Sequence, residues 1–211
     1  MWNPAFRTIA EQRGWQVHMF GKAGCPLMDL PTFSAQLHRE YTECDRWRRV
    51  AMDRLVADPP RLVVVSMWRQ YGLDGYPAGF SSYGEAWRAG LTRLVRQLRE
   101  VGVKVLVLGP IPDPHSVVPV CLSDHLNDAA ACAPARSIAV NASGIAAELA
   151  ATTAGGGHYG DLTELFCTAA RCPVIVGNTL VYLDENHLTI EYARLLTSAI
   201  GALVDRALAV S

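Results

Sequence analysis

The chain has 211 residues, of which 50% are hydrophobic and 18% are charged. This composition supplies the core of one α/β domain and excludes a disordered chain, a collagen-like repeat and a coiled coil. Nineteen basic and twenty acidic residues give a net charge of -1, and the sequence has no block of Lys or Arg that would attract nucleic acid or an anionic membrane. It also has no run of 18 apolar residues, and Met1 to Arg7 lack the pattern of a signal peptide.

Helical and strand patterns alternate along the chain. Predicted helices cover residues 3–13, 33–57, 84–101, 134–153 and 188–208. Predicted strands cover residues 15–20, 61–66, 103–108 and 158–162, and a small hairpin covers 173–182 with its turn at Gly177-Asn178. Asn3 is the predicted N-cap of the first helix, with Pro4 at its first position. The apolar run in 61–66 is typical of a central parallel strand that is buried on both faces.

This alternation predicts an α/β fold with a mainly parallel sheet between two layers of helices. The sequence has no internal repeat and no low-complexity linker, so we predict one domain over residues 1–211. The chain opens with a helix where such a fold has a first strand. The first strand-to-helix turn of an open α/β sheet lies at its functional edge.

Six cysteines favour an extracytoplasmic domain with disulfides. No Cys-x-x-Cys pair occurs, which disfavours a zinc ribbon or a thioredoxin-like site. Six cysteines allow 15 connectivities, and the sequence alone does not choose among them. Pairing between chain neighbours is the favoured hypothesis, and six reduced, buried thiols are the alternative. The favoured pairs are Cys25–Cys44, Cys121–Cys132 and Cys167–Cys172.

The sharpest chemical signal is Asp184 and His187, three residues apart before the last helix. At this spacing the carboxylate can accept a proton from one ring nitrogen, which leaves the other nitrogen as a base for a nucleophile. The alternative is that Asp184 caps the last helix and His187 is an ordinary surface residue. From the spacing alone, this structural alternative is favoured.

The wider context changes that balance. The segments Asp161–Cys167, Cys172-Pro173 and Val181–Thr189 together resemble the C-terminal part of SGNH-hydrolase domains fused to membrane acyltransferases of the acyltransferase-3 superfamily, in their actinobacterial form. Three weaker matches follow the predicted strands. They are Lys22-Ala23-Gly24-Cys25-Pro26, Ser66-Met67-Trp68-Arg69 and Gly109-Pro110.

The resemblance implies a three-layer, flavodoxin-like hydrolase fold outside the cytoplasm, without a cofactor or metal. It implies transfer of an acyl group, often acetyl, from the membrane domain of the same polypeptide to a glycan or glycolipid hydroxyl. His187 would be the general base and Asp184 its orienting carboxylate. Gly24 falls at the place of a backbone oxyanion donor. Trp68 and Arg69 stand where the family has an Asn donor, and Arg69 could donate instead.

The family nucleophile lies in a Gly-Asp-Ser-His motif at the first strand-to-helix turn. That motif precedes the helix that matches residues 2–6, so we expect the nucleophile strand to lie upstream of Met1. Ser66 is the best substitute by position, although it matches no nucleophile elbow. The missing first strand and the missing serine belong to the same expected segment. Without that segment, the 211 residues contain a candidate base but no matching nucleophile.

Two other groups of residues have weaker functional interpretations. A metal site could form from residues of the predicted loops, although exposed loop positions are the favoured interpretation. These residues are Asp113, His115, Asp124, His125, His158 and Asp161. The glycine-rich stretch 72–84 is either a flap that offers aromatic faces to a sugar or a loop that covers a sheet edge.

Three function classes therefore remain at the level of sequence. The first is a membrane O-acyltransferase domain, or a related stand-alone carbohydrate esterase. The second is a glycan-binding module without catalysis on the same scaffold, and the third is a metal-dependent hydrolase.

Overall fold

The computed structural model describes residues 1–34, 36–68 and 82–209. The chain divides into two compact units. One consists of residues 1–19, 111–141 and 162–205, and the other of residues 20–110, 142–161 and 206–211. No helix among the described residues is long and apolar enough to cross a membrane. One domain over the whole chain stays a prediction.

The second unit contains a parallel sheet of three strands in the order β3-β4-β5. Its strands are β3 (Leu62–Ser66), β4 (Lys104–Leu108) and β5 (His158–Gly160), which fall within the three segments predicted. Four of the five residues of β4 are buried, because β4 has a neighbour on each side. The central position predicted for β3 is wrong for the described part of the chain, where β3 is an edge strand with one buried residue, Val65.

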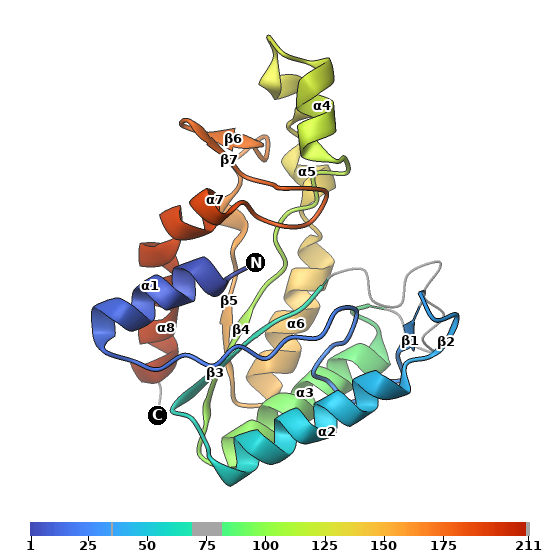
Figure 1. Ribbon diagram of the computed structural model, residues 1–211, viewed down its shortest axis with the longest axis vertical. Coiled ribbons are helices and arrows are strands. Elements are labelled where there is room, and N and C mark those ends of the chain that lie inside the picture. Colours follow the sequence, from blue (N-terminus) through green and yellow to red (C-terminus); the bar gives the residue numbers. More distant parts are fainter. Residues whose placement is uncertain (35, 69–81, 210–211) are drawn as a thin grey trace. The chain divides into compact units, whose positions relative to one another are not determined.

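Three helices accompany this sheet: α2 (Thr42–Ala57), α3 (Glu85–Glu100) and α6 (Ala142–Ala154). The most apolar face belongs to α3, whose Trp87, Leu91 and Leu98 have no exposed surface. These side chains recur at helical spacing and form the core with strands β3 and β4. Helices α3 and α6 pack together, and the turn after α6 approaches Val95 so closely that a Cβ atom at Gly155 or Gly157 would clash with it. Figure 1 shows α2 and α3 side by side.

The predicted helix over 33–57 is too long at its N-terminal end. The first part is a small hairpin, β1 (Phe33–Ser34) with β2 (Arg39–Glu40). His38 has a φ of 51°, which a right-handed helix excludes, and the N–H of Tyr41 donates to the carbonyl of Thr32 at 2.7 Å. The helical pattern is therefore real only from Thr42 onward.

Two further predicted helices are each interrupted. Residues 134–153 form α5 (Arg136–Ala139) and α6, because Val140 is extended between them. Residues 188–208 form α7 (Ile190–Leu195) and α8 (Thr197–Ala209), with a break at Leu196. The predicted hairpin is confirmed as β6 (Ile175–Val176) and β7 (Thr179–Leu180).

The first unit contains α1 (Asn3–Arg13), which packs against α7. Its N-cap is Trp2 and not the predicted Asn3, although Pro4 does lie in the first turn. An ion pair between Arg13 and Asp205 ties the end of α1 to α8 at 2.6 Å. The strand predicted at 15–20 is wrong, because this exposed segment pairs with no strand among the described residues.

The chain between β4 and α6 carries a second group of elements of the first unit. Helix α4 (Val118–Asp124) is followed by the 3-10 helix η1 (Ala129–Cys132), and both appear at the tip of the green and yellow part of Figure 1. Val120 and Leu126 are exposed there. The Cys121–Cys132 disulfide joins α4 to η1 and stabilises a segment with little apolar burial of its own.

All six cysteines are paired as the favoured hypothesis predicts. The disulfides are Cys25–Cys44, Cys121–Cys132 and Cys167–Cys172, and they close loops with sequence separations of 19, 11 and 5 residues. The alternative of six reduced thiols is wrong for this structure.

A buried acid lies between α6 and β5. Glu148 of α6 is 3% exposed, and the hydroxyl of Tyr159 donates to its Oε2 atom at 3.1 Å. Burial raises the pKa of Glu148 to about 7, although the hydrogen bond from Tyr159 acts in the opposite direction. Burial and the neighbouring Glu148 raise the pKa of Tyr159.

Glu148→Gln will flatten the pH dependence of stability. Between pH 4.5 and about 7 folded Glu148 keeps a proton that the unfolded chain has released, so the free energy of unfolding falls as the pH rises. The loss is at most about 3 kcal/mol, from 1.4 kcal/mol per unit of pKa. Glutamine keeps an acceptor for Tyr159 without a charge, so the variant is the more stable protein at pH 8. Urea unfolding at pH 5 and pH 8 measures this, with exposed Glu11→Gln as control; an unchanged slope for Glu148→Gln contradicts it.

Candidate active site

The turn that contains Asp184 and His187 lies directly before α7. The Nδ1 atom of His187 lies 2.7 Å from Oδ2 of Asp184. The other carboxylate oxygen, Oδ1, accepts hydrogen bonds of 2.7 Å from the backbone N–H groups of Asn186 and His187. Three donors therefore fix the carboxylate, and the hydrogen bond expected from the spacing is present. When Nδ1 donates to Asp184, the nitrogen of the neutral ring without a proton is Nε2.

Backbone hydrogen bonds join the two ends of this turn. Tyr182 and Leu188 form an antiparallel bridge, and the N–H of Leu183 donates to the carbonyl of His187 at 2.7 Å. The buried hydroxyl of Tyr182 donates to the carbonyl of Pro112 at 3.0 Å. The turn is therefore held to the segment that follows β4, within the same compact unit.

Thr189 is the N-cap of α7. Its hydroxyl accepts a hydrogen bond from the first turn of the helix at 3.1 Å and donates to the carbonyl of Leu180 at 2.5 Å. The interpretation of Asp184 as the helix cap is therefore wrong, because another residue has that role and the Asp184 carboxylate is used inside the turn.

The electrostatics of the turn favour an ionised carboxylate beside an accessible imidazole. Burial alone raises the pKa of Asp184, but hydrogen bonds from the backbone of Asn186 and from His187 outweigh it, so the pKa lies below its ordinary value of 3.8. The stability that this carboxylate contributes is present at neutral pH and is lost as the pH falls through that lowered pKa. The side chain of His187 is 56% exposed, so a reactant can reach its ring.

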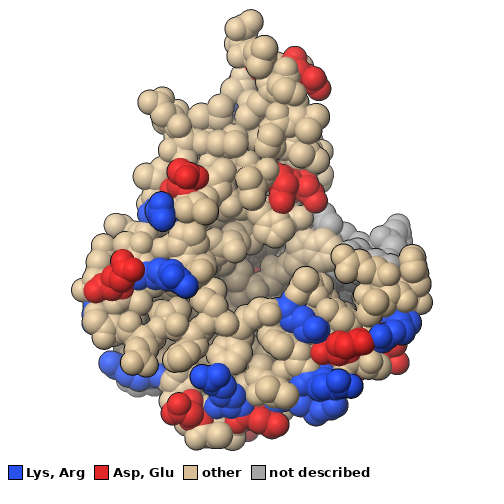
Figure 2. Space-filling view, viewed as in Figure 1, with Lys and Arg blue, Asp and Glu red and all other residues tan. Residues whose placement is uncertain are grey.

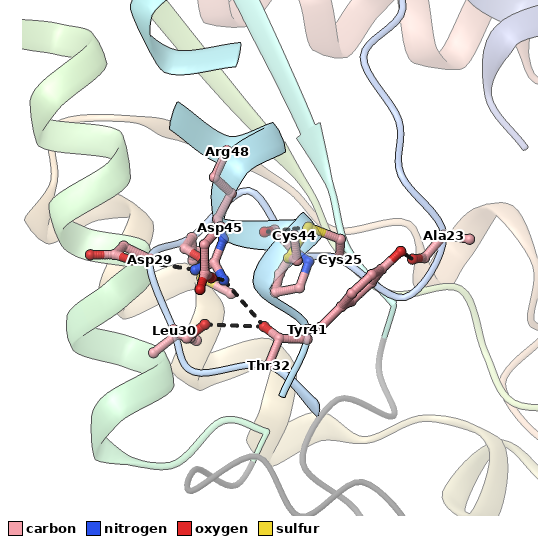
Figure 3. The surroundings of a disulfide bond; sticks show 11 residues. Ala23, Cys25, Asp29, Leu30, Thr32, Tyr41, Cys44, Asp45 and Arg48 are labelled. Carbon is pink, nitrogen blue, oxygen red and sulfur yellow. Dashed lines mark hydrogen bonds and ion pairs between the residues drawn. A yellow bond between two sulfur atoms is a disulfide. The ribbon is translucent and has the colours of Figure 1, made fainter. Parts of the chain in front are cut away.

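Gly24 lies in the loop between α1 and α2, in the second unit. Its φ of +63° is in the left-handed region, which strains most other residues. The N–H of Cys25 donates to the carbonyl of Lys22 at 3.2 Å and closes a tight turn around the Ala23–Gly24 peptide. Figure 3 shows the surroundings of this turn, where the Cys25–Cys44 disulfide joins the loop to α2.

A buried arginine holds the rest of this loop. The Arg48 guanidinium on α2 donates to the carbonyl of Met28 at 2.7 Å and to the hydroxyl of Thr32 at 3.4 Å. It also forms ion pairs with Asp45 and, at 3.4 Å, with Asp29 (Figure 3). Burial lowers the pKa of Arg48 but leaves it cationic at neutral pH.

The residues proposed for a side-chain oxyanion donor are only partly described. Trp68 is half-buried and packs against the core of the second unit. Arg69 and most of the glycine-rich stretch 72–84 lie outside the described residues. Ser66, the substitute nucleophile by position, is exposed at the end of β3. The structure thus brings Asp184 and His187 together, while Gly24, Ser66 and Trp68 belong to the other unit.

The loop residues weighed for a metal site do not converge in the part of the chain that the structure describes. No group of three or more His, Cys, Asp or Glu side chains lies together there. His115 instead contacts the carbonyl of Ile138 at 3.3 Å, and Asp113 accepts the backbone N–H of His115 at 2.8 Å. These contacts stabilise the loop.

Sequence reasoning missed Arg48, Tyr41 and Tyr182. Arg48 shares the inner face of a helix with Cys44, and an arginine on an apolar face at that spacing indicates a buried cation. The long-range contacts of the two tyrosine hydroxyls with backbone carbonyls have no local sequence signal. Thr189 could have been found, since a threonine before a periodic segment is a standard N-cap signal.

The charges on the molecular surface are mixed in sign. Figure 2 shows Lys and Arg side chains interspersed with Asp and Glu over the helical face of the second unit, without a field of one sign. Between residues 105 and 135 the sequence has no Lys or Arg.

Two comparisons with known proteins bear on this site. The model of the family described as "SGNH domain (fused to AT3 domains)" matches residues 1–202. The chain belongs to this SGNH family. A search of curated proteins finds no match.

Among solved structures, this SGNH domain is similar to the periplasmic domain of a lipopolysaccharide acetyltransferase from Salmonella ser. Paratyphi A. The TM-score is 0.77 at 14% sequence identity, over 97% of this chain and 78% of that chain. At this identity the similarity establishes the fold. The predicted class, an α/β fold of SGNH-hydrolase type with a parallel sheet, is therefore confirmed.

Proposed function

We propose that the chain is the extracytoplasmic part of a membrane O-acyltransferase that transfers an acyl group, most simply acetyl, to a hydroxyl of a cell-surface or exported glycan or glycolipid. The observation that carries the proposal is the Asp184–His187 contact of 2.7 Å with the His187 side chain 56% exposed, in a chain of the SGNH family. The family description adds the partner, a membrane acyltransferase domain in the same polypeptide.

The proposed reaction uses the Nε2 atom of His187 as its base. The Nε2 atom takes the proton of a serine hydroxyl as its oxygen attacks the acyl carbonyl, and Asp184 stabilises the resulting imidazolium. That proton passes to the leaving group of the donor as the acyl-serine forms. Nε2 then takes the proton of the glycan hydroxyl as its oxygen attacks, and returns it to the serine oxygen when the ester product leaves.

Each attack places a negative charge on the carbonyl oxygen of the acyl group. We assign the N–H of Gly24 as one hydrogen-bond donor to this oxyanion, with Arg69 or Trp68 as a side-chain donor. The Gly24 N–H donates a hydrogen bond without transferring its proton, so its contribution depends on where the N–H points.

We propose that the serine comes from a strand that is not among the 211 residues. No Gly-Asp-Ser-His sequence occurs in them. Two features support a further strand. The apolar strand β3 is an edge strand in the described sheet, and the exposed segment 15–20 carries the apolar alternation of a strand without pairing.

A fluorophosphonate probe, which labels activated serines, tests this proposal. We expect no labelling of the 211-residue chain and labelling of a form extended upstream by about forty residues of its own gene, because only the extended form holds a nucleophile beside His187. Peptide mass spectrometry locates the adduct. Labelling of neither form, with measurable glycan affinity by calorimetry, would favour the binding module instead. An adduct on Ser66 would place the nucleophile inside the chain.

A further inference from the structure

We propose that Tyr41 is a positioning residue for the oxyanion donor, acting together with the Cys25–Cys44 disulfide on the peptide N–H of Gly24. The inference rests on the proposed function and names two tethers within it. Both tethers start at the beginning of α2, and they hold the residues on either side of Gly24.

The first tether is the hydroxyl of Tyr41, which donates to the carbonyl of Ala23 at 3.3 Å. Figure 3 shows the Tyr41 ring extending from the start of α2 to Ala23. All described peptide bonds are trans, so the C=O and N–H of the Ala23–Gly24 peptide point in opposite directions. A hydrogen bond that fixes the Ala23 carbonyl toward Tyr41 therefore directs the Gly24 N–H away from it.

The second tether is the disulfide. Cys25, directly after Gly24, is 6% exposed and is joined to fully buried Cys44 with a Cα–Cα distance of 5.5 Å. The N–H of Cys44 donates to the carbonyl of Tyr41 at 2.8 Å, so the two anchors belong to one rigid helical start. The ammonium of Lys22, the first residue of the turn, lies 5.2 Å from the centre of the Tyr41 ring, which adds a cation–π contact.

Gly24 needs such tethers because of its own backbone freedom. A glycine with a φ of +63° has many accessible alternatives, and nothing lies within 4 Å of the position of a Cβ atom there. No neighbour among the described residues therefore packs against that side of Gly24, and besides the turn hydrogen bond from Cys25 to Lys22 the two tethers restrict the peptide plane. A donor stabilises the transition state fully only when it already points at the oxyanion before charge develops.

Tyr41→Phe in the full-length protein tests the first tether. We expect kcat for acyl transfer to fall about three- to tenfold, the range for one neutral hydrogen bond, with an unchanged KM. A lower kcat with an unchanged KM indicates that the lost interaction stabilises the transition state and not the bound substrate. The matched control is Tyr192→Phe, which removes another hydroxyl that donates to a backbone carbonyl, that of Leu165 at 2.6 Å. The control should keep its kcat.

The second tether has its own variant, the double substitution Cys25→Ser with Cys44→Ser. We expect it to lower kcat by a similar factor, and more strongly in combination with Tyr41→Phe. The matched control is Cys121→Ser with Cys132→Ser, which opens a disulfide of the first unit. All rates are measured well below each variant's Tm, so that a loss of folded protein does not contribute.

The outcomes separate this inference from the proposed function. His187→Ala is measured in parallel. If His187→Ala abolishes transfer while Tyr41→Phe and the Cys25/Cys44 double variant keep the wild-type kcat, the tethers have no role in catalysis and the inference is overturned. If His187→Ala is as active as wild type, the proposed function itself fails. An equal loss of kcat in the Tyr41→Phe and Tyr192→Phe variants would also overturn the inference, because it would indicate a general structural effect.

Discussion

His187→Ala in the full-length protein is expected to lower kcat for acyl transfer by about 10⁴- to 10⁶-fold, because a positioned general base contributes up to about 10⁴-fold and loss of the histidine of a serine triad costs up to about 10⁶-fold. In the proposed mechanism the imidazole accepts the serine proton, and alanine offers no replacement. The exposed loop residue His125 provides the matched control, and His125→Ala should transfer at the wild-type rate. A His187→Ala variant with wild-type kcat would exclude the proposed mechanism.

Asp184→Asn tests whether the proposed base, His187, must be oriented by a carboxylate or needs only to be present. The asparagine oxygen can still accept the two backbone N–H groups that Asp184 Oδ1 binds, so the turn keeps its shape. Its amide nitrogen then faces Nδ1 of His187 as a donor, which forces the ring proton to Nε2 and removes the base. We expect a loss of about 10²- to 10⁴-fold in kcat, with the KM for the acceptor unchanged. An equally large rise in KM would instead indicate a collapsed turn.

Arg48→Met is expected to give the largest loss of stability, about 3 kcal/mol in the free energy of unfolding. Methionine fills a similar volume but donates nothing to the carbonyl of Met28, a residue without exposed surface, and it leaves Asp45 without its cation. Because Met28 and Thr32, which also accept from Arg48, lie between Cys25 and the hairpin, this loop should also become more sensitive to proteases than in wild type. Urea unfolding and limited proteolysis measure the two effects.

Two substitutions sharpen that measurement. Arg49→Met changes the exposed neighbouring residue and should alter the free energy of unfolding by less than about 0.5 kcal/mol. Arg48→Lys keeps the charge, but its compact ammonium cannot reach all the acceptors that the planar guanidinium reaches at once. Its free energy of unfolding should therefore lie between those of Arg48→Met and wild type. Similar values for Arg48→Met and Arg49→Met would show that the buried network adds no net stability.

The parallel strands could be predicted because their signal is local. The apolar runs that became β3 and β4 differ by one residue or less at each end from the segments predicted, since a strand buried in a sheet needs such a run along its whole length. The place of β3 in the strand order could not be predicted in the same way. Strand order depends on which segments pair, and a single sequence does not encode it in any window.

The boundaries that were wrong also have local causes. The residues before α2 have a helical sequence pattern but form a hairpin. The left-handed backbone of His38 and the hydrogen bond from the Tyr41 N–H to the Thr32 carbonyl are incompatible with a helix there. The segment 15–20 has the alternation of a strand, but a strand forms only where it has a neighbour to pair with.

The contacts of the candidate site also differ in whether they are local in the sequence. Asp184 and His187 are three residues apart, and the geometry of one turn brings them together whatever the rest of the fold does. Tyr41 and Ala23 are 18 residues apart and meet only because the disulfide and Arg48 fold the loop back on α2. Sequence spacing therefore identifies the Asp184–His187 pair, while a contact such as that between Tyr41 and Ala23 needs coordinates.

The connectivity of the disulfides has a consequence for biosynthesis. The six cysteines are joined in three consecutive pairs along the chain, at separations of 19, 11 and 5 residues, and each pair closes within one compact unit. When such a chain crosses a membrane from its N-terminus, each first cysteine meets its native partner before any later thiol has emerged. An oxidant alone can then complete the pattern in order of export, so the yield of native protein should depend little on a disulfide isomerase.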